Sequence, residues 1–419
     1  MSKNSFFIDY QVKIATEFVQ QFIYRSNDFS VQNSAIRSLT LTSELKSFFS
    51  GNRKFGKRDR TFITELCFSY FRSAGLFSNL NVDEHFFAGL YLSSKEYNES
   101  EKFFMQKMHS SIMGESFSLM DFKSRQAEIF RLFPHAKANS LFNLDLVQAK
   151  EFFSDSVDFE NWQKSFFYPS GFFIRIKLEH KKEILEEFSK KNIFHQDIEF
   201  SEIIFLLKLG TKVDDCLTYQ KGYFEIQDLS SQMLYQVYNP KPNEFWWDAC
   251  AASGGKSLLL LEKEPFIQLT ASDIRTSILQ NYEWRLKKLG YTNFQTFVVD
   301  LSQESNLNSY YDGILLDVPC SGSGTWKRNP ENRFFSSNDK IVQFSNLQRK
   351  IIDNVIPYLK TNGQLIYSTC SVFKKENEDQ VNYIKEKHGL SLVSAGILHD
   401  FTYNSDWIFY AIFSKKNEV

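Results

Sequence analysis

The sequence predicts a protein of several domains: a helical N-terminal region, a small connecting α+β module and a C-terminal α/β domain. Its 419 residues are enough for two or three domains, and a hydrophobic content of 42% is ample for packed cores. Apolar positions recur with a helical period up to about residue 150. From residue 223 onward, apolar runs alternate with helices, which is typical of a parallel sheet covered on both faces.

The helical domain is predicted to span residues 1–148. Aromatic-rich runs such as residues 63–71 place their apolar side chains at helical spacing. The region is mildly basic, and its positive charge is densest over residues 53–60. We interpret this stretch as a loop leading into a helix, where Lys57 and Arg58 can meet phosphates. A solvated charged face is the alternative interpretation.

The remaining strands and helices follow from short apolar segments. Residues 149–222 form the predicted α+β module, with strands at 172–178 and 201–209 and a helix at 180–192. Residues 223–419 form the predicted α/β domain, whose strands are FWWDA (245–249), QLTASDI (268–274), QTFVVDL (295–301), DGILLDV (312–318) and QLIYSTC (364–370). Two further strand-like segments, LSLVSA and WIFYAIFSKK, come last and can complete the sheet.

Composition sets the broad class. A formal net charge of -1 argues mildly against a nucleic-acid partner, whereas 44 Phe residues supply core and stacking surface. The five cysteines are too far apart for a zinc knuckle or a redox pair, so we expect no metal and a reducing compartment. We find no leader sequence and no apolar run long enough to span a membrane. We therefore expect a soluble, monomeric, cytoplasmic protein.

The first strand of the α/β domain ends in a turn of small residues that enters a helix. Such a turn lets backbone N–H groups approach a ligand closely. A phosphate-binding Walker loop is excluded because Cys250 stands where its first glycine is required, and no dinucleotide G-x-G-x-x-G is present. The candidate binding residues of this turn are Cys250, Ala251, Ala252, Ser253, Gly254, Gly255 and Lys256.

Three acids end the next three strands. Asp273, Asp300 and Asp317 follow strands whose carboxyl ends meet at one edge of a parallel sheet, where open α/β sheets bind ligands. A carboxylate at the position of Asp273 can accept hydrogen bonds from both hydroxyls of a ribose. A single acid of this kind is often only a helix cap or turn residue, but three in register favour one crevice that binds a nucleoside.

Two cysteines follow the fourth and fifth strands. Cys320 lies in the segment Asp317-Val-Pro-Cys-Ser-Gly-Ser-Gly, and Cys370 lies in Tyr367-Ser-Thr-Cys-Ser. A lone cysteine is usually an inert core residue. Because both of these lie at strand-to-loop exits among small residues, we expect them to face the same crevice.

Together these motifs resemble those of the RsmB/Sun-type RNA cytosine-C5 methyltransferases. The resemblance rests on DACAASGGK, ASDIR, VVDL, LLDVPCSGSGTWKRNPE and IYSTCSVFKKENEDQV in this order, and covers roughly residues 221–419. Residues 43–72 are similar, more weakly, to the NusB-like N-terminal domain of the ribosomal RNA members. Three features depart from the family: Ser253 replaces a proline, Trp407-Ile408 replaces Gly-Phe, and a Pro-Gly loop is missing near residues 399–405.

The resemblance implies a Rossmann-like class I methyltransferase domain that uses S-adenosyl-L-methionine and acts on RNA. It implies that Cys370 adds to C6 of the cytosine, that Asp317 holds or protonates N3 and that Cys320 assists release. The glycine turn then holds the methionine end of the cofactor, Asp273 its ribose and Asp300 its adenine, and Asp317 lies near its sulfonium. Candidate RNA contacts are Lys327, Arg328, Arg333, Lys57 and Arg58.

Several alternatives remain at this point. The NusB-like region favours small-subunit (16S) ribosomal RNA as the substrate, but transfer RNA is a close alternative. A non-catalytic RNA-binding or ribosome-assembly factor is disfavoured because it has no chemical need for two cysteines and three acids. Glu376, Asn377 and Glu378 also match a family motif, but acids in a first helical turn stabilise a helix without any catalytic role.

Overall fold

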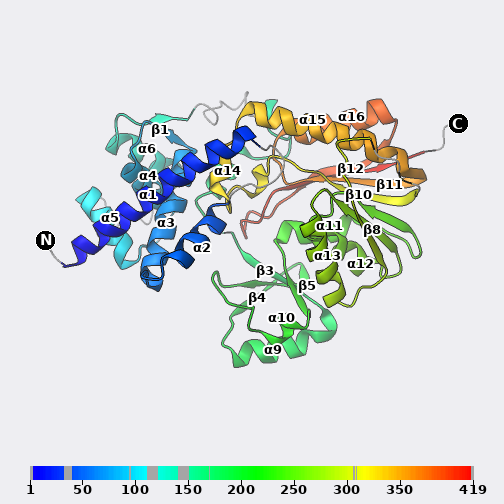
Figure 1. The fold of residues 1–419 in the computed structure, drawn as a ribbon, viewed down its shortest axis with the longest axis horizontal. Helices are drawn as coiled ribbons and strands as arrows, with labels where there is room; N and C mark the ends of the chain where they lie inside the picture. Colours follow the sequence, from blue (N-terminus) through cyan, green and yellow to red (C-terminus); the bar gives the residue numbers. More distant parts are fainter. Residues whose placement is uncertain are drawn as a thin grey trace. The chain divides into compact units, whose positions relative to one another are not determined.

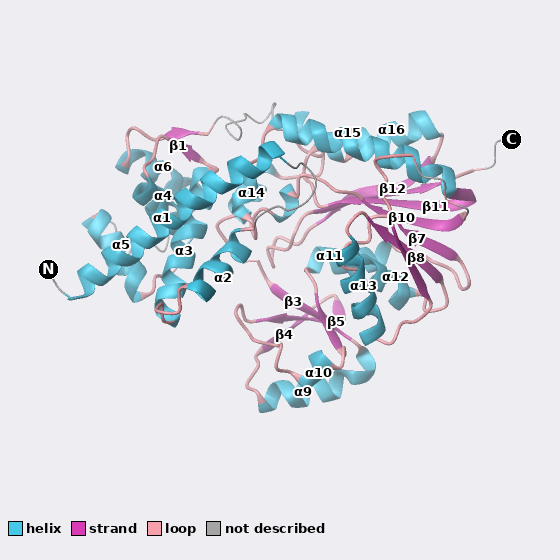
Figure 2. Cartoon of the chain, viewed as in Figure 1, coloured by secondary structure: helices cyan, strands magenta, loops and turns pink. Residues whose placement is uncertain are grey.

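The computed structural model describes residues 3–32, 40–93, 96–110, 121–139, 151–168, 170–304, 307 and 309–416. The chain divides into two compact units, which Figures 1 and 2 show as ribbons. The helical unit comprises Met1–Ala149, Phe159–Pro169 and Trp326–Ser337, and the sheet unit comprises Lys150–Asp158, Ser170–Thr325 and Asn338–Val419.

The helical unit is built from helices and one two-stranded antiparallel pair, β1 with β2. Its helices begin at polar caps. Asn98 and Glu101 form a reciprocal capping box, and Asp121 accepts a hydrogen bond from the backbone N–H of Ser124. Its elements are α1 (Lys3–Gln32), α2 (Leu41–Gly51), α3 (Lys57–Ala74), β1 (Phe77–Ser78), α4 (Val82–Ser93), α5 (Glu99–Met108), α6 (Phe122–Leu132), β2 (Lys137–Ala138), α8 (Phe159–Ser165) and α14 (Pro330–Phe334).

The segment Trp326–Ser337 belongs to the helical unit although the residues before and after it belong to the sheet unit. Aromatic rings hold it there: Phe334 packs edge-on against Phe71 with centroids 5.5 Å apart, and Phe335 lies 6.2 Å from Phe22. The carboxylate of Glu331 accepts a hydrogen bond from the backbone N–H of Leu41 at 2.9 Å. Part of the phenylalanine excess therefore serves this packing.

The main sheet of the sheet unit has seven strands in the order β12-β13-β11-β10-β7-β8-β9. Strands β11, β10, β7, β8 and β9 are parallel, whereas β13 pairs antiparallel with both β11 and β12. The strands are β7 (Phe245–Asp248), β8 (Gln268–Asp273), β9 (Phe294–Val298), β10 (Tyr311–Asp317), β11 (Leu359–Thr369), β12 (Ser391–Leu398) and β13 (Ile408–Ser414).

Helices cover both faces of this sheet, α15 and α16 on one face and α11, α12 and α13 on the other (Figure 1). They are α11 (Leu229–Val237), α12 (Gly255–Lys263), α13 (Thr276–Lys288), α15 (Asn338–Val355) and α16 (Glu378–His388), with short 3-10 turns η5 (Ser323–Thr325), η6 (Ile356–Tyr358) and η7 (Lys374–Glu376). Successive strand residues such as Leu315 and Leu316 enter opposite cores, as the pleat requires.

A four-stranded antiparallel sheet of order β4-β5-β3-β6 precedes the main sheet in the chain. Its elements are β3 (Phe172–Ile176), η4 (Leu178–His180), α9 (Lys181–Lys190), β4 (His195–Ile198), β5 (Ser201–Leu207), α10 (Leu217–Gln220) and β6 (Phe224–Ile226). The buried side chains of Ile184 and Phe188 from α9 pack into the core of this sheet.

The fold class predicted from the sequence is confirmed: a helical N-terminal region is followed by a Rossmann-like α/β domain. All five strands predicted between residues 245 and 370 are present. The domain boundaries at residues 148 and 222, and the NusB-like character of the first domain, stay predictions. Among the described residues, no helix is long and apolar enough to cross a membrane.

We predict that Gly313→Ala destabilises the sheet unit. A Cβ on Gly313 would lie 2.3 Å from the ring of Trp246, which is 1% exposed on the neighbouring strand and has no room to shift. Overpacking of this kind costs about 1–3 kcal/mol. Urea unfolding measures the loss, and Gly396→Ala is the control because its Cβ would make only ordinary contacts at 3.6 Å. Equal midpoints for the two variants would contradict the prediction.

Candidate active site

The carboxyl ends of β7, β8 and β10 lie at one edge of the main sheet. Strand β7 lies between β10 and β8, so the chain reverses its direction of winding beside β7. In open α/β sheets, ligands bind at such a switch point, outside the carboxyl ends of the strands. The candidate residues found in the sequence follow these strands.

The turn after β7 bends sharply before α12. Ala252 and Gly254 adopt left-handed backbone angles, with φ of 46° and 82°. At Gly254 a Cβ would approach the ring of Tyr282 at 2.7 Å, so this position requires glycine. The small residues of the turn leave its backbone open to a ligand, as expected for a cofactor loop.

Side chains from α13 and from the segment before β7 hydrogen-bond to the backbone of this turn. Arg285 donates to the carbonyl oxygen of Ser253 at 3.1 Å and forms an ion pair with Glu225 at 2.6 Å. Gln227 donates to the carbonyl oxygen of Gly255 at 3.2 Å. These contacts are local to the sheet unit and fix the shape of the turn.

Asp273 ends β8 and faces the same turn. Its Oδ2 accepts from the backbone N–H of Ala252 at 3.1 Å, and both of its oxygens accept from the guanidinium of Arg275 at 2.9 and 3.0 Å. Burial raises the pKa of Asp273, but the hydrogen bonds from Arg275 and Ala252 bring it below the usual range. Asp273 is therefore an anchored carboxylate, which a ribose would share with the half-exposed Arg275.

A fourth acid, Asp248, ends β7 and was not among the predicted site residues. Asp248 is 1% exposed; its Oδ2 accepts from Ser257 at 2.6 Å, while its Oδ1 has no hydrogen-bond partner. Burial raises the pKa of Asp248 to about 7. This unpartnered buried oxygen, the bare backbone of the turn and the carboxylate of Asp273 fit a nucleoside cofactor with a charged tail. Asp300 lies after β9, where its Oδ1 accepts from Ser302.

Lys256 and Asp317 form an ion pair between the cofactor turn and the end of β10. Lys256 Nζ donates to Asp317 Oδ2 at 2.6 Å. Burial lowers the pKa of Lys256, but the charge of Asp317 outweighs this effect and the pKa is raised. The pair brings a fixed positive charge and a fixed negative charge to the crevice.

The two cysteines meet. The Sγ atoms of Cys320 and Cys370 lie 3.3 Å apart, within hydrogen-bonding distance, and both thiols are free of disulfides. The hydrogen bond to Cys370 raises the pKa of the Cys320 thiol, and burial raises it further. These effects favour the protonated form of Cys320.

A buried carboxylate joins the loops that carry the cysteines. Glu376 Oε2 accepts from the hydroxyls of Ser321 and Ser371, both at 2.5 Å. Its Oε1 accepts from the backbone N–H of Ser321 at 2.8 Å and from Gln348 at 3.2 Å. Glu376 lies in η7, before the first turn of α16, so stabilising a helix does not explain its position. The sequence signals for these contacts were the repeated Cys-Ser pairs and the match of Glu376 to a family motif.

Of the residues that depart from the family pattern, Trp407 lies in packed surroundings and Ser253 does not. Trp407 is 1% exposed and stacks on His399 with ring centroids 3.7 Å apart. Its carbonyl oxygen would lie 2.1 Å from a Cβ at Gly324, whose own N–H donates to the carbonyl of Cys370 at 2.8 Å. Ser253 has an exposed side chain.

Three of the five side chains predicted to contact RNA are exposed, and two are buried. Lys57 and Arg58 are exposed in the first turn of α3, and Arg328 is exposed. Lys327 and Arg333 are 5% and 2% exposed, and the Arg333 guanidinium lies 4.5 Å from the centroid of Phe166. Lys327 and Arg333 are buried because the segment that carries them is part of the helical unit, and their role as RNA contacts stays a prediction.

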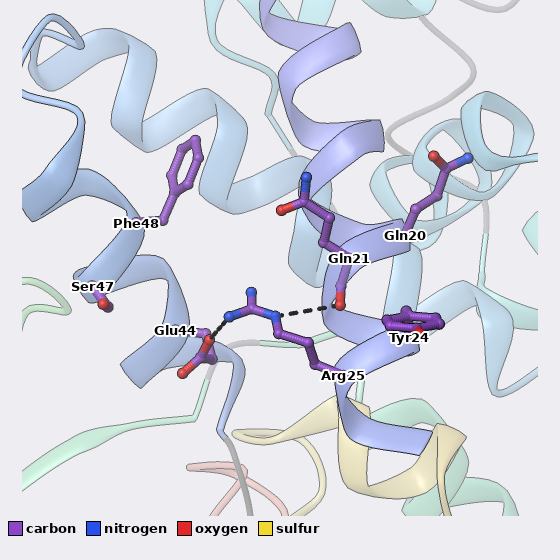
Figure 3. Close-up of a pocket in the computed structure, with 7 residues that line it drawn as sticks. All are labelled: Gln20, Gln21, Tyr24, Arg25, Glu44, Ser47 and Phe48. Carbon is purple, nitrogen blue, oxygen red and sulfur yellow. Dashed lines mark hydrogen bonds and ion pairs between the residues drawn. The ribbon is translucent and has the colours of Figure 1, made fainter. Parts of the chain in front are cut away.

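The helical unit also contains a groove of about 640 Å³ between α1 and α2 (Figure 3). Across it, Arg25 forms an ion pair with Glu44 at 2.8 Å. The groove is lined by Gln20, Gln21, Tyr24, Arg25, Glu44, Ser47 and Phe48. None of these is a cysteine or an unpaired acid, so the candidate chemistry stays with the sheet unit.

The fold and the site are those of a Rossmann-like methyltransferase domain. Comparison with known proteins supports this class. Residues 235–404 match the family described as "16S rRNA methyltransferase RsmB/F". This match lies within the region whose motifs resemble the RsmB/Sun-type family, so it supports that resemblance and S-adenosyl-L-methionine as the cofactor.

Individual relatives match over part of their length. The chain is 36% identical over 187 residues to the ribosomal RNA small subunit methyltransferase B of Shewanella oneidensis, and 34% identical over 188 residues to the probable enzyme of that name from Synechocystis. These alignments cover 43% and 42% of the two relatives, so the match spans less than half of each.

Two solved structures share the fold. The crystal structure of PH0851 has a TM-score of 0.66 at 21% identity, covering 89% of this chain and 94% of that one. NSun6 from Pyrococcus horikoshii, solved with SFG, has a TM-score of 0.56 at 17% identity, covering 62% of this chain and 94% of that one.

We predict that Asp273→Ala weakens binding of S-adenosylmethionine roughly tenfold to a hundredfold. Hydrogen bonds to a charged group are worth about 1.5–3 kcal/mol, and this carboxylate is the anchored acceptor at the end of β8. Titration calorimetry measures the change. Asp312→Ala is the matched control, because Asp312 lies near the opposite end of β10 and pairs with Lys360. Unchanged affinity in Asp273→Ala would remove it from the site.

Proposed function

We propose that this chain transfers a methyl group from S-adenosylmethionine to C5 of a cytosine in RNA, with small-subunit ribosomal RNA as the substrate. The observation that carries the proposal is the 3.3 Å contact between Cys320 and Cys370 at the cofactor edge of the sheet. One thiolate is enough to activate a pyrimidine. A covalent reaction whose release step is assisted by a second thiol uses both Cys320 and Cys370. A ribosomal RNA substrate also makes the cytoplasm the site of action.

Cys370 is the proposed nucleophile. C5 of cytosine is a poor nucleophile, so a thiolate first adds at C6 and the C5–C6 electron pair becomes available at C5. S-adenosylmethionine supplies the methyl group on a sulfonium, a good leaving group. A thiolate at Cys370 would accept a hydrogen bond from the Cys320 thiol 3.3 Å away, which stabilises the charged form.

Asp317 is the proposed partner of cytosine N3. As the thiolate adds to C6, negative charge moves toward N3, and a hydrogen bond or proton from a carboxyl group at that position stabilises it. Because Asp317 is ionised in its pair with Lys256, the proton for N3 would come from the Lys256 ammonium, whose Nζ donates to Asp317 Oδ2 at 2.6 Å. Asp317 would pass this proton on and remain a carboxylate, while Lys256 becomes a neutral amine.

Cys320 is the proposed base for release. Its pKa is raised while Cys370 carries the negative charge beside it. When the sulfur of Cys370 is bonded to C6, that charge is gone and Cys320 ionises more readily, losing its proton to water. The Cys320 thiolate can then take the C5 proton, and the C6–S bond breaks to return Cys370 as a thiolate.

The remaining predicted residues are proposed binding contacts. The turn from Cys250 to Lys256 would hold the methionine end of the cofactor, Asp273 its ribose and Asp300 its adenine. For RNA we propose Lys57, Arg58 and Arg328. Cations in the first turn of α3 oppose the helix dipole, so Lys57 and Arg58 are not explained by the stability of the helix.

The cysteine variants test the mechanism. Cys320→Ala should accumulate a covalent complex with RNA, because addition and methyl transfer proceed while release fails. Cys370→Ala should form none. Denaturing gel electrophoresis of each variant with RNA and S-adenosylmethionine shows the adduct. Adduct in Cys370→Ala and none in Cys320→Ala would reverse the two assignments.

The substrate is tested in cells. Bisulfite sequencing of total RNA from a deletion strain and its parent should show one or more cytosines in small-subunit ribosomal RNA that lose protection. Loss of protection only in transfer RNA would favour the alternative substrate. A purified protein that binds no S-adenosylmethionine would favour the non-catalytic assembly factor.

A further inference from the structure

The two cysteine loops are joined by a hydrogen-bond network that contains the carboxyl group of Glu376. The loop after β10 reaches it through the N–H and hydroxyl of Ser321, and the loop after β11 reaches it through the hydroxyl of Ser371. Asn377 adds a second tie within the later loop, where its Nδ2 donates to the carbonyl of Ser371 at 2.9 Å. Ser323 also contacts the hydroxyls of both serines at 3.2 Å, and the two hydroxyls lie 3.3 Å apart. Glu376 is the charged member of this network.

Burial raises the pKa of Glu376, and the hydrogen bonds from Ser321, Ser371 and Gln348 oppose this rise by favouring the ionised form. Four donors converge on its two oxygens, two on each, which is the pattern of a carboxylate because a protonated acid would have to donate one bond. Ser371 uses its oxygen to accept from the N–H of Phe373 at 3.0 Å, which leaves its proton for Glu376. The negative charge is fully buried at 0% exposure.

This charge acts on the cysteine pair. Among the groups that bear on Cys320, the neighbouring thiol of Cys370 comes first and the carboxylate of Glu376 also disfavours its ionisation. Tyr367, from β11, is buried and neutral, and its hydroxyl donates to the backbone carbonyl of Glu376. Lys256, held by Asp317, interacts with Cys370, whose negative charge raises the pKa of Lys256. The negative charge of Glu376 acts on Cys320 and the positive charge of Lys256 acts on Cys370, so both charges favour a proton on Cys320 rather than on Cys370.

We propose that Glu376 is a positioning residue that ties the Cys320 loop to the Cys370 loop and, through its charge, keeps the proton of the pair on Cys320. Its effect on methyl transfer rests on the proposed function. Its effect on the ionisation and reactivity of the two thiols does not rest on the proposed function. The two effects can therefore be measured separately.

Thiol alkylation tests the charge. Iodoacetamide reacts with thiolates, so the alkylation of Cys320 and Cys370 peptides, followed by mass spectrometry against pH, reports the ionisation of each. Glu376→Gln keeps the size and can still accept from the backbone of Ser321, but it removes the charge. We expect the alkylation midpoint to fall by about one pH unit and the share on Cys320 to rise. Glu378→Gln, two residues away, is the control and should match the parent protein.

Disulfide formation tests the tie. Diamide takes up two electrons and two protons from a pair of thiols as their S–S bond forms, and sulfurs 3.3 Å apart need little movement to react. In Glu376→Ala the serines lose their shared acceptor, so we expect cross-linking of Cys320 to Cys370 to slow at least several-fold. Glu376→Gln should restore most of the parent rate.

The outcomes separate the two proposals. Parent-like alkylation of Glu376→Gln together with parent-like cross-linking of Glu376→Ala would overturn the role of Glu376, whatever the activity. The expected thiol changes without any RNA methylation by the parent protein would support Glu376 and contradict the proposed function. Far-ultraviolet circular dichroism of each variant identifies loss of fold, in which case Glu376→Asp, with its shorter carboxylate, replaces Glu376→Ala.

Discussion

The parallel pairing of β10 with β11 is the constraint on which the site depends. Asp317 pairs with Ser368 across these strands, so the chain leaves the sheet at the same edge and at the same level twice. Cys320 follows Asp317 by three residues and Cys370 follows Ser368 by two. A contact of 3.3 Å between sulfurs that are 50 residues apart in sequence is thus a consequence of strand register.

Charge inside the crevice is balanced locally. Lys256 pairs with Asp317 and Arg275 pairs with Asp273, while Asp248 has a pKa raised to about 7 by burial. A net charge of -1 over the chain does not reveal these pairs. Such an arrangement suits a sulfonium cofactor, because the acids attract it and the fixed cations prevent an excess of buried negative charge.

The sequence predicted the parallel strands, their common edge and the residues that end each strand, because period and turn composition determine these features. It did not predict the surroundings of Arg333. The cluster that includes Lys327 and Arg333 follows the Cys320 motif directly, yet its segment packs among the phenylalanines of the helical unit. Membership of a packed unit depends on contacts far away in sequence, which local pattern does not contain.

Glu376 was missed for a related reason. Its motif resembles a helix start, and acids are common there. The structure places it in a 3-10 turn whose side chain points back to the serines beside both cysteines. Side-chain direction in a turn follows from the backbone path, so only the structure assigned this carboxylate to the site.

The most direct test of the central claim is the identity of the methylated nucleoside. The purified full chain is incubated with small-subunit ribosomal RNA and methyl-labelled S-adenosylmethionine, and the RNA is digested to nucleosides for mass spectrometry. Label in 5-methylcytidine is the predicted result. Label in any other nucleoside, or label in 5-methylcytidine that persists in the Cys370→Ala variant, would contradict a covalent reaction at C5 of cytosine.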